Sequence, residues 1–184
     1  MKIWALIVAV GVSAAVAFTL LQSRRNVVSV PVEKSVFSEE GLKMKNVQYR
    51  QNDAGAGAKW VLDAKEVRFS QDRDRVSFVN FILKVDRQDR PSLKLRGDEG
   101  EYSKDSGLLH LWGNLEGWSA DGYRILTDHV VFDEKNRNLS NDRPVKIFGP
   151  YFLVEGRGLS VDLQKERFEV LSQVMAIVRK EPPI

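Results

Sequence analysis

The side chains in this sequence that could do chemistry are two histidines and several groups of carboxylates. There is no cysteine, so disulfides and thiolate chemistry are excluded. His110 and His129 lie in expected strands without a second histidine at ligand spacing, which argues against a metal site. Carboxylates such as Asp98, Glu99 and Glu101 fall on expected strand edges and turns, where a solvated surface explains them. The sequence also lacks a Gly-X-Ser-X-Gly elbow, a catalytic triad and a phosphate loop. We therefore expect a binding protein rather than an enzyme, with no catalytic residue, metal or cofactor.

The distribution of charge argues against a nucleic-acid-binding protein. The formal net charge of +3 comes from Lys2, Arg24 and Arg25, which flank the N-terminal apolar run. Without these three, the 28 Lys and Arg fall to 25, which equals the number of Asp and Glu. A neutral domain has no overall excess of cations with which to neutralise phosphates.

The N-terminal segment has the composition of a membrane anchor. The 18 residues Trp4–Leu21 carry no charge and would span about 27 Å as a helix, close to the thickness of a bilayer core. A removable signal peptide, cleaved after Ala15–Ala17, is the alternative. We favour the anchor because the apolar run continues to Leu21. The expected organisation is an anchor at 1–25, a tether at 26–38 and a folded domain at 39–184, placed outside the cytoplasm because the segment is N-terminal and signal-like.

The folded domain contains an internal repeat of about 30 residues. Each unit begins with an apolar, any, apolar, any, small pattern, continues through a polar turn, and returns to alternating apolar residues. The period of two predicts strands with one apolar face, so each unit is expected to be a β-hairpin. The apolar position after each small residue follows at a step of three, which predicts a bulge there. The units begin with Trp60–Ala64, Leu93–Gly97, Tyr123–Thr127 and Phe152–Gly156.

The repeat predicts an all-β fold. With a further strand at Leu42–Tyr49, about nine strands are expected and no helix after Ser23. Hairpins with one apolar face cannot bury that face alone, so we expect a sandwich-like or rolled sheet. An all-β domain with an apolar face and no catalytic group is interpreted as a binding module.

Six motifs follow one another along the chain, namely Trp60–Phe69, Leu95–Tyr102, Gly107–Gly113, Gly122–Asp128, Asp142–Val145 and Val154–Leu159. Their order along nearly the whole chain, together with the N-terminal anchor, resembles the lipopolysaccharide export family LptC. The resemblance implies an open, twisted β-jellyroll of the OstA-like kind, held on the periplasmic side of the inner membrane by one transmembrane helix. It further implies that lipopolysaccharide is received from an ATP-driven extraction complex of the ABC type and passed to periplasmic LptA. The alternative is an anchored or secreted β-sandwich that binds carbohydrate or protein and has no lipid groove.

This interpretation assigns residues to a lipid groove by their phase in the repeat, to a docking edge for the partner, and to one hinge candidate, Gly149. The partner edge comprises Val161, Phe168, Val170, Val174 and Val178. The lipid groove comprises Trp60, Leu62, Phe78, Ile82, Leu95, Leu109, Leu111, Leu115, Ile125, Phe132, Val145, Val154, Phe168 and Val174.

Overall fold

The structure is a computed structural model, described here for residues 36–38, 41–53, 58–87, 90–162, 165 and 167–179. The expected anchor and most of the expected tether lie outside the described residues. Within the described part of the chain, no helix has the length and apolar character needed to cross a bilayer.

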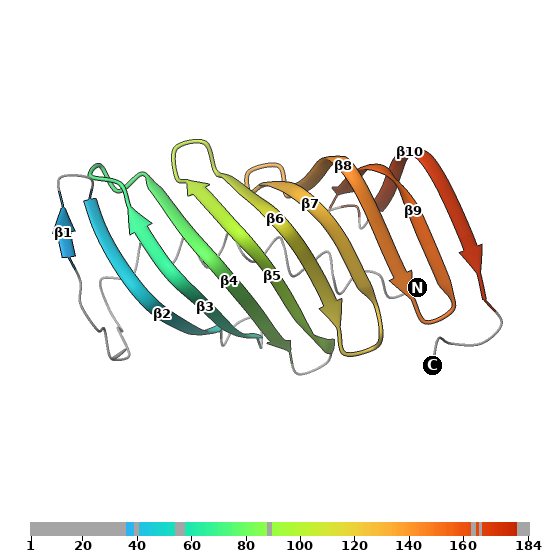
Figure 1. Cartoon of the computed structure of the whole chain (residues 1–184), viewed down its shortest axis with the longest axis horizontal. Helices are drawn as coiled ribbons and strands as arrows, with labels where there is room; N and C mark the ends of the chain where they lie inside the picture. The colour runs from blue at the N-terminus through green and yellow to red at the C-terminus, as the bar shows by residue number, and fades with distance from the viewer. Residues whose placement is uncertain are drawn as a thin grey trace.

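The described chain forms one antiparallel sheet in which every strand pairs with its neighbours in sequence (Figure 1). The all-β prediction is thereby confirmed, and each repeat unit is one hairpin, beginning with the β3–β4 pair. The short first strand starts at Val36, so the sheet begins within the segment expected to be the tether. The ten strands are β1 (Val36–Ser38), β2 (Gly41–Asp53), β3 (Ala58–Phe69), β4 (Arg75–Arg87), β5 (Arg90–Ser103), β6 (Leu108–Ser119), β7 (Arg124–Asp133), β8 (Asn138–Gly149), β9 (Phe152–Asp162) and β10 (Arg167–Val178).

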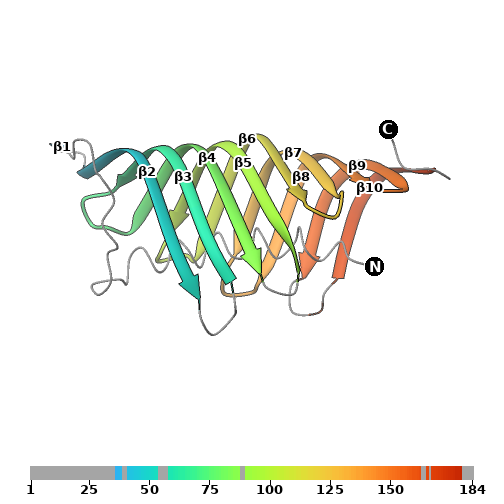
Figure 2. The same cartoon turned by 90° about the horizontal axis from the view of Figure 1, so that it is seen from below.

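The sheet arches over, so that the two halves of the long strands face each other (Figure 2). The concave side is the inner face, and the opposite side is the outer face. Alternate residues of a strand point to opposite sides, which explains why Phe81, Leu83 and Val85 are buried while Ile82 is exposed. Burial on the inner face holds the two halves together.

A line of left-handed residues crosses the sheet where the strands bend. Asn46, Asn80 and Asn114 have positive φ in the middle of β2, β4 and β6. Asparagine adopts this conformation more readily than most residues, so it suits a bend inside a strand. Gly113, Gly158 and Gln173 also have positive φ in the bends of their strands.

The bends fall where the sequence predicts bulges, but the extra residue lies on a different strand. Between Ala64↔Phe81 and Glu66↔Val79, the β3–β4 ladder leaves one residue unpaired on each strand. From the β5–β6 ladder onward, one strand of each pair has one more residue at the bend than the strand it pairs with. That longer strand is β6, β8 or β10. The prediction that the strands containing the small residues carry the bulge is therefore wrong. Those strands bend, and the neighbouring strand supplies the extra residue.

Candidate functional site

The inner face contains most of the predicted groove residues, and its centre is buried. Leu109 and Leu111 on β6 have an exposed fraction of 0%. Toward the C-terminal strands the burial is incomplete, because Ile125, Val154 and Phe168 are only half-buried. The backbone of Trp60 is described but its side chain is not. The remaining predicted groove residues that are buried here are Leu62, Phe78, Leu95, Leu115, Phe132 and Val145.

Ile82 is a predicted groove residue that the structure places on the outer face. Its side chain is 40% exposed, whereas Phe81 and Leu83 on either side are each 2% exposed. Its neighbours across the sheet are Asp63 on β3 and Arg96 on β5, which belong to a polar surface. The assignment of Ile82 to the groove is therefore wrong.

Two phenylalanine rings of β4 fill space that β5 leaves empty. Phe78 pairs with Gly100, and Phe81 pairs with Gly97. The two rings contact edge to face with their centroids 5.0 Å apart. A Cβ atom added to Gly100 would lie 2.3 Å from the Phe78 ring, so a larger residue is excluded unless the ring moves. The rings thus cover the bend of the neighbouring strand, a known way of packing a glycine within a sheet.

The last strand, β10, is an edge with apolar residues on both faces. Among the described strands it pairs with β9 alone, so within this part of the chain its other side presents unpaired backbone groups. The ladder pairs Val154 with Ala176 and Phe152 with Val178, which puts these β10 residues on the inner face. Val174, two positions before Ala176, is 55% exposed, and Val178 is 82% exposed. On the outer side Met175 and Ile177 are also exposed.

This edge concentrates the exposed apolar surface of the described chain. Among the described residues the large exposed apolar side chains outside β10 are Ile82 and Tyr151, and Tyr151 lies in the turn next to the edge. The assignment of Val161 to the edge is wrong, because this residue is 1% exposed and lies on β9, which is paired on both sides. Phe168 and Val170 lie on β10 but are half-buried. The exposed edge is thus the C-terminal half of β10.

Gly149, the hinge candidate, makes room for the strand next to the edge. It is buried at the end of β8 and pairs with Phe152. A Cβ atom there would lie 2.4 Å from the Phe152 ring. That ring lies 6.2 Å from the Tyr123 ring, and the Phe152 backbone pairs with Val178 on the edge. A side chain at position 149 would therefore displace Phe152, and the structure gives this glycine a packing role.

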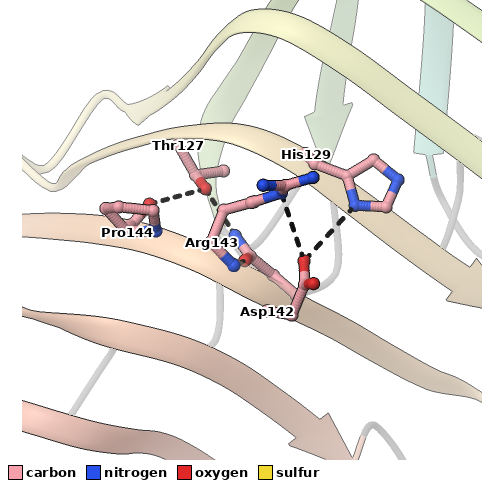
Figure 3. Close-up of polar contacts among 6 residues, drawn as sticks. Thr127, His129, Asp142, Arg143 and Pro144 are labelled. Carbon is pink, nitrogen blue, oxygen red and sulfur yellow. Dashed lines mark hydrogen bonds and ion pairs between the residues drawn. The ribbon is translucent and has the colours of Figure 1, made fainter.

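A polar network that the sequence analysis missed supports the bend of β8. The Asn141 side chain, 5% exposed, donates a hydrogen bond to Thr127 Oγ1 and accepts one from the Arg143 backbone N–H. Thr127 Oγ1 in turn donates to the Pro144 carbonyl at 2.9 Å (Figure 3). Because proline has no N–H to pair across the ladder, its position in a bulge avoids a lost hydrogen bond. In the sequence, the four residues Asn-Asp-Arg-Pro at 141–144 could have indicated this bulge, because proline inside a strand is typical of one.

The two histidines lie beside this network on the outer face. Their ring centroids are 6.1 Å apart. Asp142 Oδ1 lies 4.0 Å from His129 Nδ1 and 3.5 Å from Arg143 Nε (Figure 3). Partial burial, and then the charge of His110, lower the pKa of His129 below its ordinary value of 6.5. Among the described residues no group of three or more His, Cys, Asp or Glu is arranged to hold a metal ion.

The fold and the site define an all-β protein with a buried apolar inner face and an open apolar edge. A family model described as "Lipopolysaccharide-assembly, LptC-related" matches residues 5–179. The chain belongs to this family. Its members are periplasmic components of lipopolysaccharide transport, and the family is not known as one of enzymes.

Other comparisons add little to this assignment. Among solved structures, the chain is similar to LptH of Pseudomonas aeruginosa, described as the LptA homologous periplasmic component of the lipopolysaccharide transport device. The identity is 9%, the TM-score is 0.31, and the match covers 74% of this chain and 93% of that one. No curated protein sequence matches the chain.

Proposed function

We propose that this chain is anchored in the inner membrane by residues 1–25 and carries lipopolysaccharide along the inner face of its periplasmic sheet. In this proposal it receives the lipid from an ABC-type extraction complex and passes it to LptA. The observation that supports the proposal best is the continuity of the apolar inner face. It runs from the buried centre at Leu109 and Leu111 to the exposed edge at Val174 and Val178.

The need for such a face follows from the acyl chains of the lipid. Burial stabilises a methylene group by about 0.8 kcal/mol, so exposing one twelve-carbon chain to water costs roughly 8 to 10 kcal/mol. Several chains therefore need continuous cover during transfer. The energy for directed movement must come from the extraction complex, since the sequence has no phosphate loop.

The distribution of burial suggests where the lipid enters and leaves. At the centre the inner-face side chains are already buried, so acyl chains need the two halves of the arch to separate. Near the C-terminal strands, Val154 and Phe168 are half-buried and Val174 is exposed, so less packing has to be broken. We therefore place the exit of the lipid at the β9–β10 end.

The β10 edge is suited to joining a second sheet. A strand added to it would satisfy the unpaired backbone groups and cover Val174 and Val178 on the inner side. The inner faces of the two sheets would then be continuous. In this proposal the added strand belongs to LptA.

Competition binding separates this proposal from a carbohydrate-binding sandwich. The full chain in lipid nanodiscs would be equilibrated with labelled lipopolysaccharide and then challenged with lipid A or with the fully deacylated saccharide. We expect lipid A to displace the label and the saccharide to fail even in large excess. Displacement by the saccharide alone would favour the sandwich, and no binding of labelled lipopolysaccharide would refute the proposal.

A further inference from the structure

The outer face carries a band of cations and aromatic rings that the lipid-carrying function does not use. Two rows of directly paired residues cross the sheet from β3 to β10. The cations of these rows lie on β4, β5, β7 and β8, and the apolar members lie among them. We call this surface the outer band, and it comprises Ile82, Lys84, Lys94, Arg96, Trp118, Arg124, Lys146 and Phe148.

The two arginines of the outer band are held in place by one carboxylate. Glu116 on β6 is 9% exposed and forms ion pairs of 2.5 Å with Arg96 and with Arg124. The Arg96 guanidinium lies 6.0 Å from the centroid of the Trp118 ring, and that of Arg124 lies 5.8 Å from Phe148. One negative charge thus faces two positive charges, and the excess is fixed beside aromatic rings.

Two of the three lysines of the outer band have a carboxylate partner, Lys146 in Glu155 at 2.8 Å and Lys84 in Asp63. The five cations of the two rows therefore exceed their three carboxylates, Asp63, Glu116 and Glu155, by two. Lys84 and Lys94 are directly opposite each other on β4 and β5. Like charges in this arrangement destabilise a sheet. Lys84 Nζ lies 3.4 Å from Asp63, but among the described residues no hydrogen bond or ion pair involves the Lys94 ammonium. A surface that keeps such a pair is suited to an external anion.

The apolar members of the outer band favour one class of anionic partner. Ile82 is 40% exposed in the middle of the cations, and the rings of Trp118 and Phe148 are half-buried beside them. Lys and Arg next to aromatic and aliphatic side chains are typical of surfaces that lie at the headgroup level of a bilayer. A soluble anion would need the charges but not Ile82.

The sequence also brings the outer band within reach of a bilayer. The uncharged run Trp4–Leu21 ends fourteen residues before β1 begins at Val36. Fourteen residues span at most about 45 to 50 Å when fully extended. If the expected anchor is inserted, the sheet is confined within this distance of the headgroups.

We propose that the outer band docks the sheet on an anionic phospholipid surface. Lipid carrying on the inner face can then proceed while the outer face rests on the membrane. The proposal uses the expected anchor for proximity alone, and it is independent of whether the inner face binds acyl chains.

Fluorescence quenching by labelled lipids tests this docking on the full chain. Because the sequence has no cysteine, I82C provides a single labelling site in the outer band. S140C is the matched control, since Ser140 is exposed on the outer face beyond the bend of β8. Each labelled chain would be reconstituted into nanodiscs containing a headgroup quencher, with phosphatidylcholine alone or with about a third phosphatidylglycerol.

We expect quenching at position 82 that requires phosphatidylglycerol and is lost at high salt, with little quenching at position 140. Each basic residue near an anionic membrane strengthens binding roughly five-fold, so adding K84Q, K94Q and K146Q should reduce the docked-to-free ratio about 100-fold. Circular dichroism of this variant checks that the sheet is intact. Quenching at position 82 that is absent, or independent of lipid charge and salt, would overturn the proposal. A change in fluorescence at position 82 on adding a soluble polyanion, with no change on adding phosphatidylglycerol, would also overturn the proposal.

Discussion

If LptA docks at the β10 edge as proposed, making this edge polar should weaken the docking and leave the sheet folded. The relevant change is V174S together with V178S, in the part of β10 where both faces are apolar. Val174 is 55% exposed and Val178 is 82% exposed, so this fraction of each side chain is available to be buried by a partner. Full burial of a valine side chain contributes about 1.5 to 3 kcal/mol, so the two together should contribute about 2 to 4 kcal/mol. The dissociation constant should therefore rise roughly 30- to 1000-fold.

The affinity can be measured by surface plasmon resonance, with soluble LptA as analyte and the full chain captured in nanodiscs of phosphatidylcholine alone, on which the outer band is not expected to dock. The matched control is I82S, because Ile82 is 40% exposed but lies on β4, away from the edge. The fractions already buried in the folded chain, 45% of Val174, 18% of Val178 and 60% of Ile82, should make each variant less stable by about 1 to 2 kcal/mol. The two variants are therefore matched in stability, and circular dichroism checks that both are folded. Equal affinity of the edge variant and the wild-type chain would refute the docking edge. An equal loss in the edge variant and in I82S would refute it as well.

Three further changes test the packing and the electrostatics of the sheet. G100A should destabilise the fold by about 1 to 3 kcal/mol in urea unfolding, because its Cβ would overlap the Phe78 ring; an unchanged midpoint would contradict this packing. Y102F should cost about 1.5 kcal/mol in the same assay, because the buried hydroxyl donates to Glu134 Oε2 at 2.7 Å; an equally stable variant would show that this bond contributes nothing. Because the pKa of His129 is lowered, the unfolded chain binds more protons as the pH falls below about 6.5. The free energy of unfolding should therefore decrease as the pH falls below that value, and H129Q should make this decrease smaller. The same pH dependence in H129Q and in the wild-type chain would show that His129 does not contribute to it.

The hairpins could be predicted because each contains its own signals. Alternating apolar residues set the period, and a polar turn separates the two strands of each unit. For the same reason the prediction of an all-β chain needed no information from distant contacts. The pairing of each hairpin with the next follows from the short connections, such as residues 150 and 151 between β8 and β9.

The prediction that Ile82 lies on the inner face was wrong because the bends of β4 and β6 contain different numbers of residues. On β6 the bend uses two residues, Gly113 and Asn114, so the alternation resumes in phase and Leu115 is buried. On β4 the bend uses Asn80 alone, so the alternation shifts by one and buries Phe81 and Leu83 instead of Ile82. Counting in steps of two could not reveal how many residues each bend consumes.

The edge and the outer band depend on contacts that sequence patterns do not encode. Val161 has the same apolar character as Val178, and the position of each strand in the sheet decides which one is exposed. The arginines of the outer band come from β5 and β7, and Glu116 brings them together from the strand between. A neutral overall composition concealed this local excess of positive charge.

Acyl chains that lie against the inner face would contact alternate residues of β4, and a crosslinking scan along this strand tests for that contact. A photoreactive amino acid would be placed in turn at each position from Phe81 to Val85 in cells, and adducts with lipopolysaccharide would be detected by immunoblot. We expect adducts at Phe81, Leu83 and Val85, and none at Ile82 and Lys84. Adducts of equal yield at all five positions, at the outer two alone, or at none would contradict acyl contact with the inner face.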